Sequence, residues 1–268
     1  MVRRSKSSKI RQRNNILNGA FALLLVIASL AAFGWWWNQK RSGIDPNTLC
    51  PLQGPSGHNI LLVDKTDPFN IAQKAAFDLL VTDLVTNKTP PGYLLSIFVL
   101  GDDFPTQVKP LIELCNPGDS KGRDELTENL KQINRQYKDR FLNPIFEQSS
   151  QLLSASPAKE SPILEMLQMV SLNSIQPRNV SGPKTLIILT DLLQNSKQLN
   201  MYKAVATFEQ FSNTVNARKT QINFKDVDIQ IHYLQNSPSL QVDKLFTFWK
   251  EYFKAAGAKS LDIVALPG

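Results

Sequence analysis

Residues 59–68 read Asn-Ile-Leu-Leu-Val-Asp-Lys-Thr-Asp-Pro. Four consecutive aliphatic side chains, two of them β-branched, predict a buried strand. The strand runs directly into Asp64, Thr66 and Asp67, and Pro68 follows at once. In open α/β sheets, binding sites lie beyond the carboxyl ends of the strands. This stretch therefore predicts an α/β sheet with a polar site at the end of its first strand.

The positive charge of the chain is concentrated at its amino terminus. The 268 residues carry a formal net charge of +7, from 30 basic and 23 acidic residues. Eight of the basic residues and none of the acids lie in residues 1–41, which leaves 22 basic and 23 acidic residues for the rest. Because the rest is electrically balanced, we expect no nucleic-acid partner.

Residues 16–37 form an uncharged and mostly apolar segment of 22 residues. At about 1.5 Å per residue, a helix of this length crosses a hydrocarbon layer roughly 30 Å thick. Six cations precede the segment and two follow it. The positive-inside rule then predicts a signal anchor with a cytoplasmic tail at residues 1–15. A cleaved signal peptide, with a weak small-x-small site at residues 29–31, is the alternative.

Residues 38–57 are rich in proline, glycine, serine and asparagine and predict a linker. Apolar strands and amphipathic helices alternate over residues 58–268, which we expect to form one domain. Strands are predicted at 59–63, 93–100, 108–114, 184–190, 227–234 and 261–266, and helices at 69–85, 124–154, 161–174, 199–215 and 241–256. The fold class is therefore α/β. It is a doubly wound, mostly parallel six-stranded and Rossmann-like sheet with one antiparallel edge strand, preceded by one transmembrane helix.

Three local features refine this trace. The link after the second strand is too short for a crossover helix, so residues 108–114 should return antiparallel at the sheet edge. The helix at 124–154 is long for a compact domain, and we expect it to break or kink at Asn143-Pro144. Ser161 precedes Pro162, which is the order of an N-cap residue and a first helical position.

The chain has only two cysteines, Cys50 and Cys115. Two buried free thiols are one interpretation of an isolated pair. The other is a disulfide, which the compartment outside the membrane favours. The antiparallel return of residues 108–114 brings Cys115 to the sheet edge at which the first strand begins, close to Cys50. We therefore predict a disulfide, with a stabilisation of about 4 kcal/mol in the chain-entropy model.

Polar side chains from four parts of the chain converge on the carboxyl edge of the predicted sheet. Carboxylates and hydroxyls without histidine or thiolate are hard oxygen ligands, suited to Mg²⁺, Ca²⁺ or Mn²⁺ rather than to zinc. A divalent cation would also relieve the repulsion between the acids. The converging residues are Asp64, Thr66, Asp67, Asp102, Ser161 and Asp191.

Over residues 58–268 the chain resembles a von Willebrand factor A-like domain. The resemblance rests on the order of elements with an antiparallel third strand, on Asp64-Lys65-Thr66-Asp67-Pro68, and on Leu189-Thr190-Asp191 after the fourth strand. In that family a metal-ion-dependent adhesion site uses an Asp-x-Ser-x-Ser motif, a hydroxyl from a helix–helix loop and an aspartate after the fourth strand. Carried over, the metal ligands are Asp64, Thr66, Ser161 and Asp191, with Asp67 and Asp102 as additional candidates and Mg²⁺, Ca²⁺ or Mn²⁺ as the ion.

The chain departs from the family motif at Pro68, where the family has its second motif hydroxyl. Proline cannot ligate a metal, so the resemblance implies a degenerate site in which Asp67 substitutes or no ion binds. Ser161 is the weakest of the assignments, because a role as N-cap explains it without a metal. Ser154 and Ser156 are nearby alternatives.

Two other functions compete with this interpretation. In a phosphohydrolase of the haloacid dehalogenase type, Asp64-Lys65-Thr66 would be the nucleophile loop and Asp102 would hold Mg²⁺. Pro68 argues against it, as does the separation of 38 residues between Asp64 and Asp102, which leaves little room for the intervening motifs. The third interpretation is a structural scaffold without an ion. For His58, which we place in the linker, and for His232 we predict structural or solvated roles.

Together these features predict a single-pass protein of the plasma (bacterial inner) membrane with its main domain in the periplasm or outside the cell. The resemblance implies protein binding rather than catalysis, often with an acid of the partner completing the coordination of the ion. We expect a non-enzymatic role in adhesion or in assembly of an envelope complex. Its partners are proteins, and the chain contacts the membrane through residues 16–37. The linker joins the sheet edge opposite Asp64.

Overall fold

The structure is a computed structural model that describes residues 6–40, 43–101, 109–125, 128–152, 158–178 and 180–266. The chain divides into two units, Met1–Gly43 and Ile44–Gly268. The first unit contains helix α1, Lys6–Lys40. Within it, Gly19–Trp36 has a mean hydropathy of 2.0 and exposed side chains, so it is long and apolar enough to cross a membrane.

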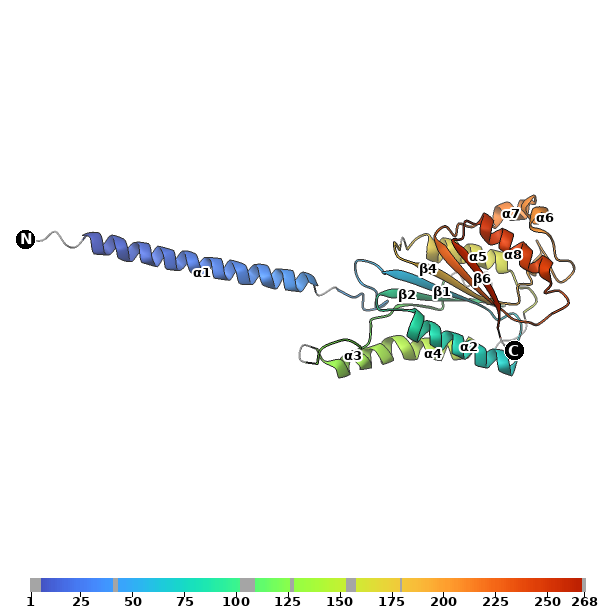
Figure 1. The fold of residues 1–268 in the computed structure, drawn as a ribbon, viewed down its shortest axis with the longest axis horizontal. Coiled ribbons are helices and arrows are strands. Elements are labelled where there is room, and N and C mark those ends of the chain that lie inside the picture. Colours follow the sequence, from blue (N-terminus) through green and yellow to red (C-terminus); the bar gives the residue numbers. More distant parts are fainter. Residues whose placement is uncertain are drawn as a thin grey trace, which may run out of the picture. The chain divides into compact units, whose positions relative to one another are not determined.

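The second unit is an α/β domain built around one six-stranded sheet (Figure 1). The strand order is β3-β2-β1-β4-β5-β6. Strand β3 is antiparallel to β2 at the edge, and the other neighbours are parallel. The predicted fold class is therefore confirmed. The strands are β1 Gly57–Asp64, β2 Tyr93–Leu100, β3 Ile112–Cys115, β4 Lys184–Thr190, β5 Val227–Tyr233 and β6 Ser260–Ala265.

Helices cover both faces of the sheet (Figure 1). On one face lie α2 Ile71–Asp83, α3 Leu130–Tyr137 and α4 Asn143–Leu152, and on the other α5 Ile163–Val170, α6 Phe208–Ser212, α7 Val215–Lys219 and α8 Asp243–Ala255. Because successive side chains of a strand point to opposite faces, β1 serves both cores. Ile60 and Leu62 pack on the α5–α8 side, whereas Leu61 and Val63 pack on the α2–α4 side.

The register of the central strands positions the polar edge. Asp64 is the last residue of β1 and pairs with Leu100 of β2. On the other side, Val63 pairs with Leu189 of β4, so the next residues of both strands, Asp64 and Thr190, end side by side. The carboxyl ends of the two central parallel strands thus deliver their polar residues to one place, as the sequence predicts.

The predicted helix at 199–215 is wrong. Residues 199–201 instead pair back with the loop after β4, through Ser196 N–H to Leu199 O and Met201 N–H to Gln194 O. The remaining segment is divided into α6 and α7, each with a threonine N-cap whose hydroxyl accepts a backbone N–H. Threonine side chains compete for backbone donors in this way, and a capping conformation at Thr214 interrupts a continuous helix.

The long helical region begins at Leu130 rather than at residue 124. It continues through Pro144, with a π-helical turn, η2 Lys138–Leu142, between α3 and α4. The N–H of Asn143 donates to the carbonyl of Lys138, five residues back. A π-turn is a recognised irregularity in such helices. In place of the break or kink expected at Asn143-Pro144, the structure has a π-helical turn that ends at Leu142, just before these two residues. Similar turns, η1 Leu84–Lys88 and η3 Ser171–Ile175, follow α2 and α5.

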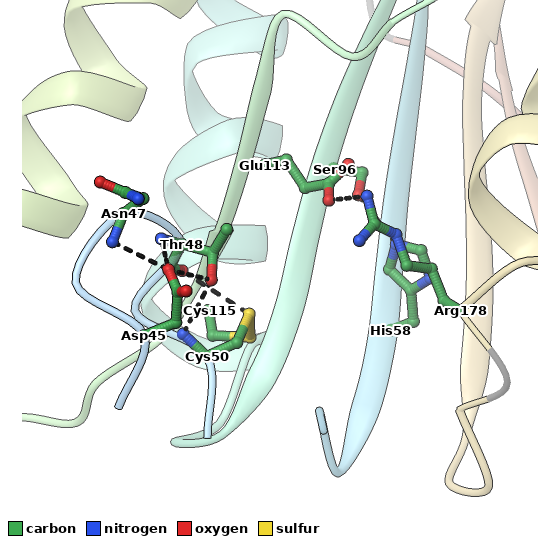
Figure 2. Close-up of a disulfide and its surroundings, with 9 residues drawn as sticks. All are labelled: Asp45, Asn47, Thr48, Cys50, His58, Ser96, Glu113, Cys115 and Arg178. Atoms are coloured by element: carbon green, nitrogen blue, oxygen red, sulfur yellow. Dashed lines mark hydrogen bonds and ion pairs between the residues drawn. A yellow bond between two sulfur atoms is a disulfide. The ribbon is translucent and has the colours of Figure 1, made fainter. Parts of the chain in front are cut away.

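The segment before β1 packs on the domain instead of forming a free linker. Leu49 is buried, and Cys115 N–H donates to the carbonyl of Thr48. Cys50 and Cys115 form a disulfide with a Cα–Cα distance of 4.7 Å, which confirms the predicted bond (Figure 2). Of the predicted linker at 38–57, residues 44–57 thus belong to the domain. We call this end of the sheet, where β1 begins, the disulfide edge.

His58 lies inside β1 and not in a linker, so that prediction is wrong. Its side chain is fully buried, and its Nε2 lies 2.9 Å from Ser96 Oγ and 3.5 Å from Ser174 Oγ. Its Nδ1 has no hydrogen-bond partner among the described residues. Burial lowers the pKa of His58 to about 3, and the charges of Arg178 and Lys184 act in the same direction. His58 is therefore a neutral core residue.

Candidate site at the Asp64 edge

The carboxylate of Asp64 is the centre of a hydrogen-bond cluster at the carboxyl ends of β1 and β4. Its Oδ1 accepts from Thr66 N–H at 3.0 Å and from Thr66 Oγ1 at 2.6 Å. Its Oδ2 accepts from Ser161 Oγ at 3.0 Å and from Thr190 Oγ1 at 2.9 Å. The Asp64 side chain is only 4% exposed, so these four donors replace the water that a charged carboxylate would otherwise require.

Ser161 reaches Asp64 because its backbone is bound to the loop after β4. Ser161 N–H donates to Asn195 O and Asn195 N–H donates to Ser161 O, both at 2.8 Å. The predicted N-cap role of Ser161 is wrong, because α5 has no side-chain cap from its N-cap residue, Pro162. Instead, Gln194 Oε1 accepts the N–H of Leu164 at 2.9 Å. The Ser161 hydroxyl is thereby left to donate to Asp64.

Asp191 follows β4 directly and lies beside this cluster. Its Oδ1 accepts from Leu193 N–H at 2.9 Å, and its Oδ2 accepts from the hydroxyl of Tyr202 at 2.8 Å. Leu192, between the two, has a φ of 67°, which is uncommon for a branched side chain. Its carbonyl accepts from Trp249 Nε1 at 2.9 Å, and this bond helps to hold the strained turn.

Both acids have pKa values above the ordinary range for aspartate. Burial raises the pKa of Asp64, although its donors Thr66, Thr190 and Ser161 oppose the change. Burial also raises the pKa of Asp191 to about 7, with a further contribution from the charge of Asp64. Like charges in a site of low polarity disfavour double ionisation. A proton or a cation at this edge therefore lowers the electrostatic cost of bringing the two carboxylates together.

Asp67 and Pro68 lie outside the cluster. Asp67 Oδ2 accepts only a long hydrogen bond, 3.5 Å, from Asn236 Nδ2 among the contacts described. An open groove lies here, and its lining residues are Asp67, Pro68, Asn70, Tyr202, Gln235, Asn236 and Ser237. Asp67 therefore contributes no hydrogen bond to the cluster among the contacts described, and it lines this groove together with Tyr202.

The predicted site residues are thus only partly brought together. Asp64, Thr66 and Ser161 share one cluster, with Asp191 beside it, whereas Asp102, Ser154 and Ser156 lie outside the described residues. Among the described residues, no group of three or more acidic, histidine or cysteine side chains is placed to hold a metal ion.

Two site residues were missed by the sequence interpretation. Thr190 stood next to Asp191 in the Leu-Thr-Asp motif, so its position at the strand end was a usable signal. Tyr202 had no such signal, because it fell within the helix predicted at 199–215. A tyrosine in a predicted helix gives no indication that its hydroxyl reaches an acid.

The strand order, the antiparallel β3 and the polar residues at the ends of β1 and β4 define the class: the domain has a von Willebrand factor A-like fold. Within that class, this chain carries Pro68 in place of the second hydroxyl of the adhesion motif. No protein-family model and no curated protein sequence matches the chain.

Solved structures of similar arrangement are distant in sequence. The VWA domain of SpRpn10 is 12% identical, with a TM-score of 0.40, over 78% of this chain and 88% of that one. An aerotolerance-related membrane protein from Bacteroides fragilis NCTC 9343 is 10% identical, with a TM-score of 0.36 and coverage of 78% and 91%. BatB, a conserved hypothetical protein from Bacteroides thetaiotaomicron, is 12% identical, with a TM-score of 0.36 and coverage of 78% and 90%. The class assignment rests on the strand order of this chain.

Proposed function

We propose that this protein is a membrane-anchored binding protein whose von Willebrand factor A-like domain holds protein partners at the Asp64 edge. The observation that carries the proposal is the convergence of three hydroxyls on the buried Asp64, beside a second buried acid, Asp191. Such convergence is typical of a binding site in an open α/β sheet.

A divalent cation is the ligand that best fits the donor chemistry. The hydroxyls of Thr66 and Ser161 donate their protons to Asp64, so lone pairs on their oxygens remain for a cation. With Asp191, they offer hard oxygen donors of the kind that Mg²⁺, Ca²⁺ and Mn²⁺ prefer, while Asp64 holds the two hydroxyls in place. When bound, the ion supplies an open coordination position for an acid of the partner. Pro68 leaves one protein ligand fewer than the family motif has.

Binding is favoured over phosphoryl transfer by the environment of Asp64. A nucleophilic aspartate needs an accessible oxygen with a free lone pair. Both oxygens of Asp64 accept hydrogen bonds, and the side chain is 4% exposed. This arrangement supports a role for Asp64 in organising hydroxyl ligands and not in attacking phosphorus.

The anchor and the disulfide support an extracytoplasmic location for the domain. Gly19–Trp36 is long and apolar enough to cross a membrane, and cations are concentrated on its amino-terminal side. Positive flanks favour the cytoplasm, which supports a location of the domain in the periplasm or outside the cell. A disulfide persists in that oxidising compartment. We propose that the protein takes part there in assembly of an envelope complex.

The cation is tested by melting the full-length protein in detergent with and without Mg²⁺, Ca²⁺ or Mn²⁺. An ion at about 100 times its dissociation constant stabilises the folded state by about 2.7 kcal/mol. For a domain of this size we therefore expect a rise in melting temperature of roughly 5–10 °C. Asp64→Asn and Asp191→Asn should abolish the rise, whereas the control Asp262→Asn, an exposed acid on β6, should retain it.

Partner binding is tested separately, by cross-linking and affinity purification from membranes that contain wild type, Asp64→Ala/Asp191→Ala or Asp262→Ala. Loss of a partner in the double variant alone supports the Asp64 edge as the binding surface. Unchanged partners in the double variant would rule out this edge. No shift in melting temperature with any ion would favour a scaffold that binds without metal.

A further inference from the structure

Tyr202 covers the second acid of the site from the solvent side. Its hydroxyl donates to Asp191 Oδ2 at 2.8 Å, while its side chain remains 38% exposed. The same residue lines the open groove beside Pro68 and Asn236. A ligand that approaches Asp191 through this groove therefore meets Tyr202 first.

The loop that carries Tyr202 is fastened on both sides. The preceding residue, Met201, is fully buried, and its N–H donates to Gln194 O at 2.8 Å. Asn200 Nδ2 donates to Asn195 Oδ1 at 2.8 Å, and Lys203 N–H donates to Asn200 Oδ1 at 3.1 Å. Tyr202 is thus held over Asp191 by its own loop as well as by its hydroxyl.

The same loop is coupled to the hydroxyl donor of Asp64. Antiparallel bridges join Ser161 to Asn195 and Asn195 to Asn200. Ser161, whose hydroxyl donates to Asp64, and Tyr202, whose hydroxyl donates to Asp191, therefore stand on opposite sides of one short hydrogen-bonded ladder. A displacement of Tyr202 would act on a backbone that also positions Ser161.

We propose that Tyr202 is a latch that competes with the ligand of the Asp64 edge for Asp191 Oδ2. This inference rests on the cation site proposed above. In the closed state, the phenol hydroxyl occupies an acceptor position that a cation, or a water bound to it, needs. Binding then requires the Tyr202–Asp191 hydrogen bond to break, so Tyr202 lowers the affinity of the edge for its ligand.

The latch is tested with Tyr202→Phe, which removes only the hydroxyl, in the full-length protein in detergent. A hydrogen bond to a carboxylate is strong enough that its loss should raise the affinity for Mn²⁺ or Mg²⁺ roughly tenfold. Titration calorimetry with each metal ion alone measures the affinity. The matched control is Tyr252→Phe, whose hydroxyl donates to Thr220 O at 3.4 Å, within the core and away from this edge. It should bind like wild type.

Each outcome of this titration is decisive. Tighter binding by Tyr202→Phe than by wild type and Tyr252→Phe supports the latch, as does binding by Tyr202→Phe alone. Equal or weaker binding by Tyr202→Phe overturns the latch but leaves the cation site intact. Absence of binding in all three proteins overturns the cation site and the latch together. Should Tyr202→Phe not fold, Tyr202→Leu, which also lacks the hydroxyl, serves the same comparison.

Discussion

At the scale of single residues, the domain buries ionisable side chains at both ends of its central strand. At the carboxyl end, the carboxylate of Asp64 accepts four hydrogen bonds from three parts of the chain, although burial still raises its pKa. At the other end, His58 has two serine hydroxyls and no acid among its hydrogen-bond partners. Burial disfavours the charged form of both groups, and at Asp64 the hydrogen bonds from Thr66, Thr190 and Ser161 oppose this effect.

The suppressed charge of His58 predicts a loss of stability in acid. Its folded-state pKa, about 3, lies below the ordinary value of 6.5, so the folded state binds its proton more weakly than the unfolded state. The contribution of neutral His58 to the free energy of unfolding is fully present above pH 6.5. It is lost as the pH falls towards 3, and the total loss is on the order of 5 kcal/mol. Urea unfolding at several pH values between 7 and 4 measures how steeply the free energy of unfolding falls with pH.

A substitution separates His58 from the carboxylates that titrate in the same range. In His58→Gln, the free energy of unfolding should fall less between pH 6.5 and pH 4 than in wild type, even if the substitution lowers stability at neutral pH. His232→Gln is the control, because His232 on β5 is only partly buried. An unchanged slope in His58→Gln would show that another group causes the acid sensitivity.

At the scale of elements, the weakest part of the sheet is reinforced covalently. Strand β3 has four residues and pairs only with β2. The disulfide links it to the segment that precedes β1, across 65 residues of sequence. An ion pair between Glu113 of β3 and Arg178 also lies near this edge (Figure 2). Strand β3 is thus bound to two parts of the chain that are distant in sequence: the segment before β1, through the disulfide, and the segment that carries Arg178, through the ion pair.

Reduction of the disulfide should therefore destabilise the whole domain. Closing a loop of this length contributes about 4 kcal/mol in the chain-entropy model. We expect a reductant to lower the melting temperature by roughly 8–16 °C. The double variant Cys50→Ser/Cys115→Ser should have the lower melting temperature both with and without reductant. A wild-type protein that melts at the same temperature in both conditions would contradict the prediction.

At the scale of the whole molecule, charge and hydropathy are divided between two units. Residues 1–41 hold eight cations and no acids, whereas the rest of the chain is electrically balanced. The apolar stretch Gly19–Trp36, within residues 1–41, has the length of a membrane span. We therefore expect the positive charge to guide insertion and orientation of the anchor.

This division predicts the topology of the protein in a bacterial inner membrane. Protease added to spheroplasts should digest the domain, and protease added to inverted vesicles should leave it intact. Replacing the six cations before the helix with glutamine should produce a fraction of inverted molecules. A matched replacement of six cations in residues 203–254 should leave the orientation unchanged. Digestion of the domain in inverted vesicles but not in spheroplasts would show that the domain faces the cytoplasm.

The order and type of most elements follow from local sequence patterns. The strands at 93–100 and 184–190 have the predicted bounds, because continuous apolar runs between turn residues have few alternatives. The disulfide was also predictable, since the chain trace left Cys50 and Cys115 at one edge. The helix predicted at 199–215 failed, because its threonines bind backbone donors and its first residues pair with the loop after β4.

The sequence alone determines which residue types lie at the Asp64 edge, because residues that follow parallel strands lie at the same edge of the sheet whatever their side chains contact. Their partners were decided only by the tertiary structure. The hydroxyls of Ser161 and Thr190 lie 97 and 126 residues from Asp64 along the chain, and no local pattern specifies which acceptor they find. Packing decides the acceptor of each hydroxyl. A polar group that is removed from water needs a hydrogen-bond partner, and only the groups that the packed elements bring close to it are available.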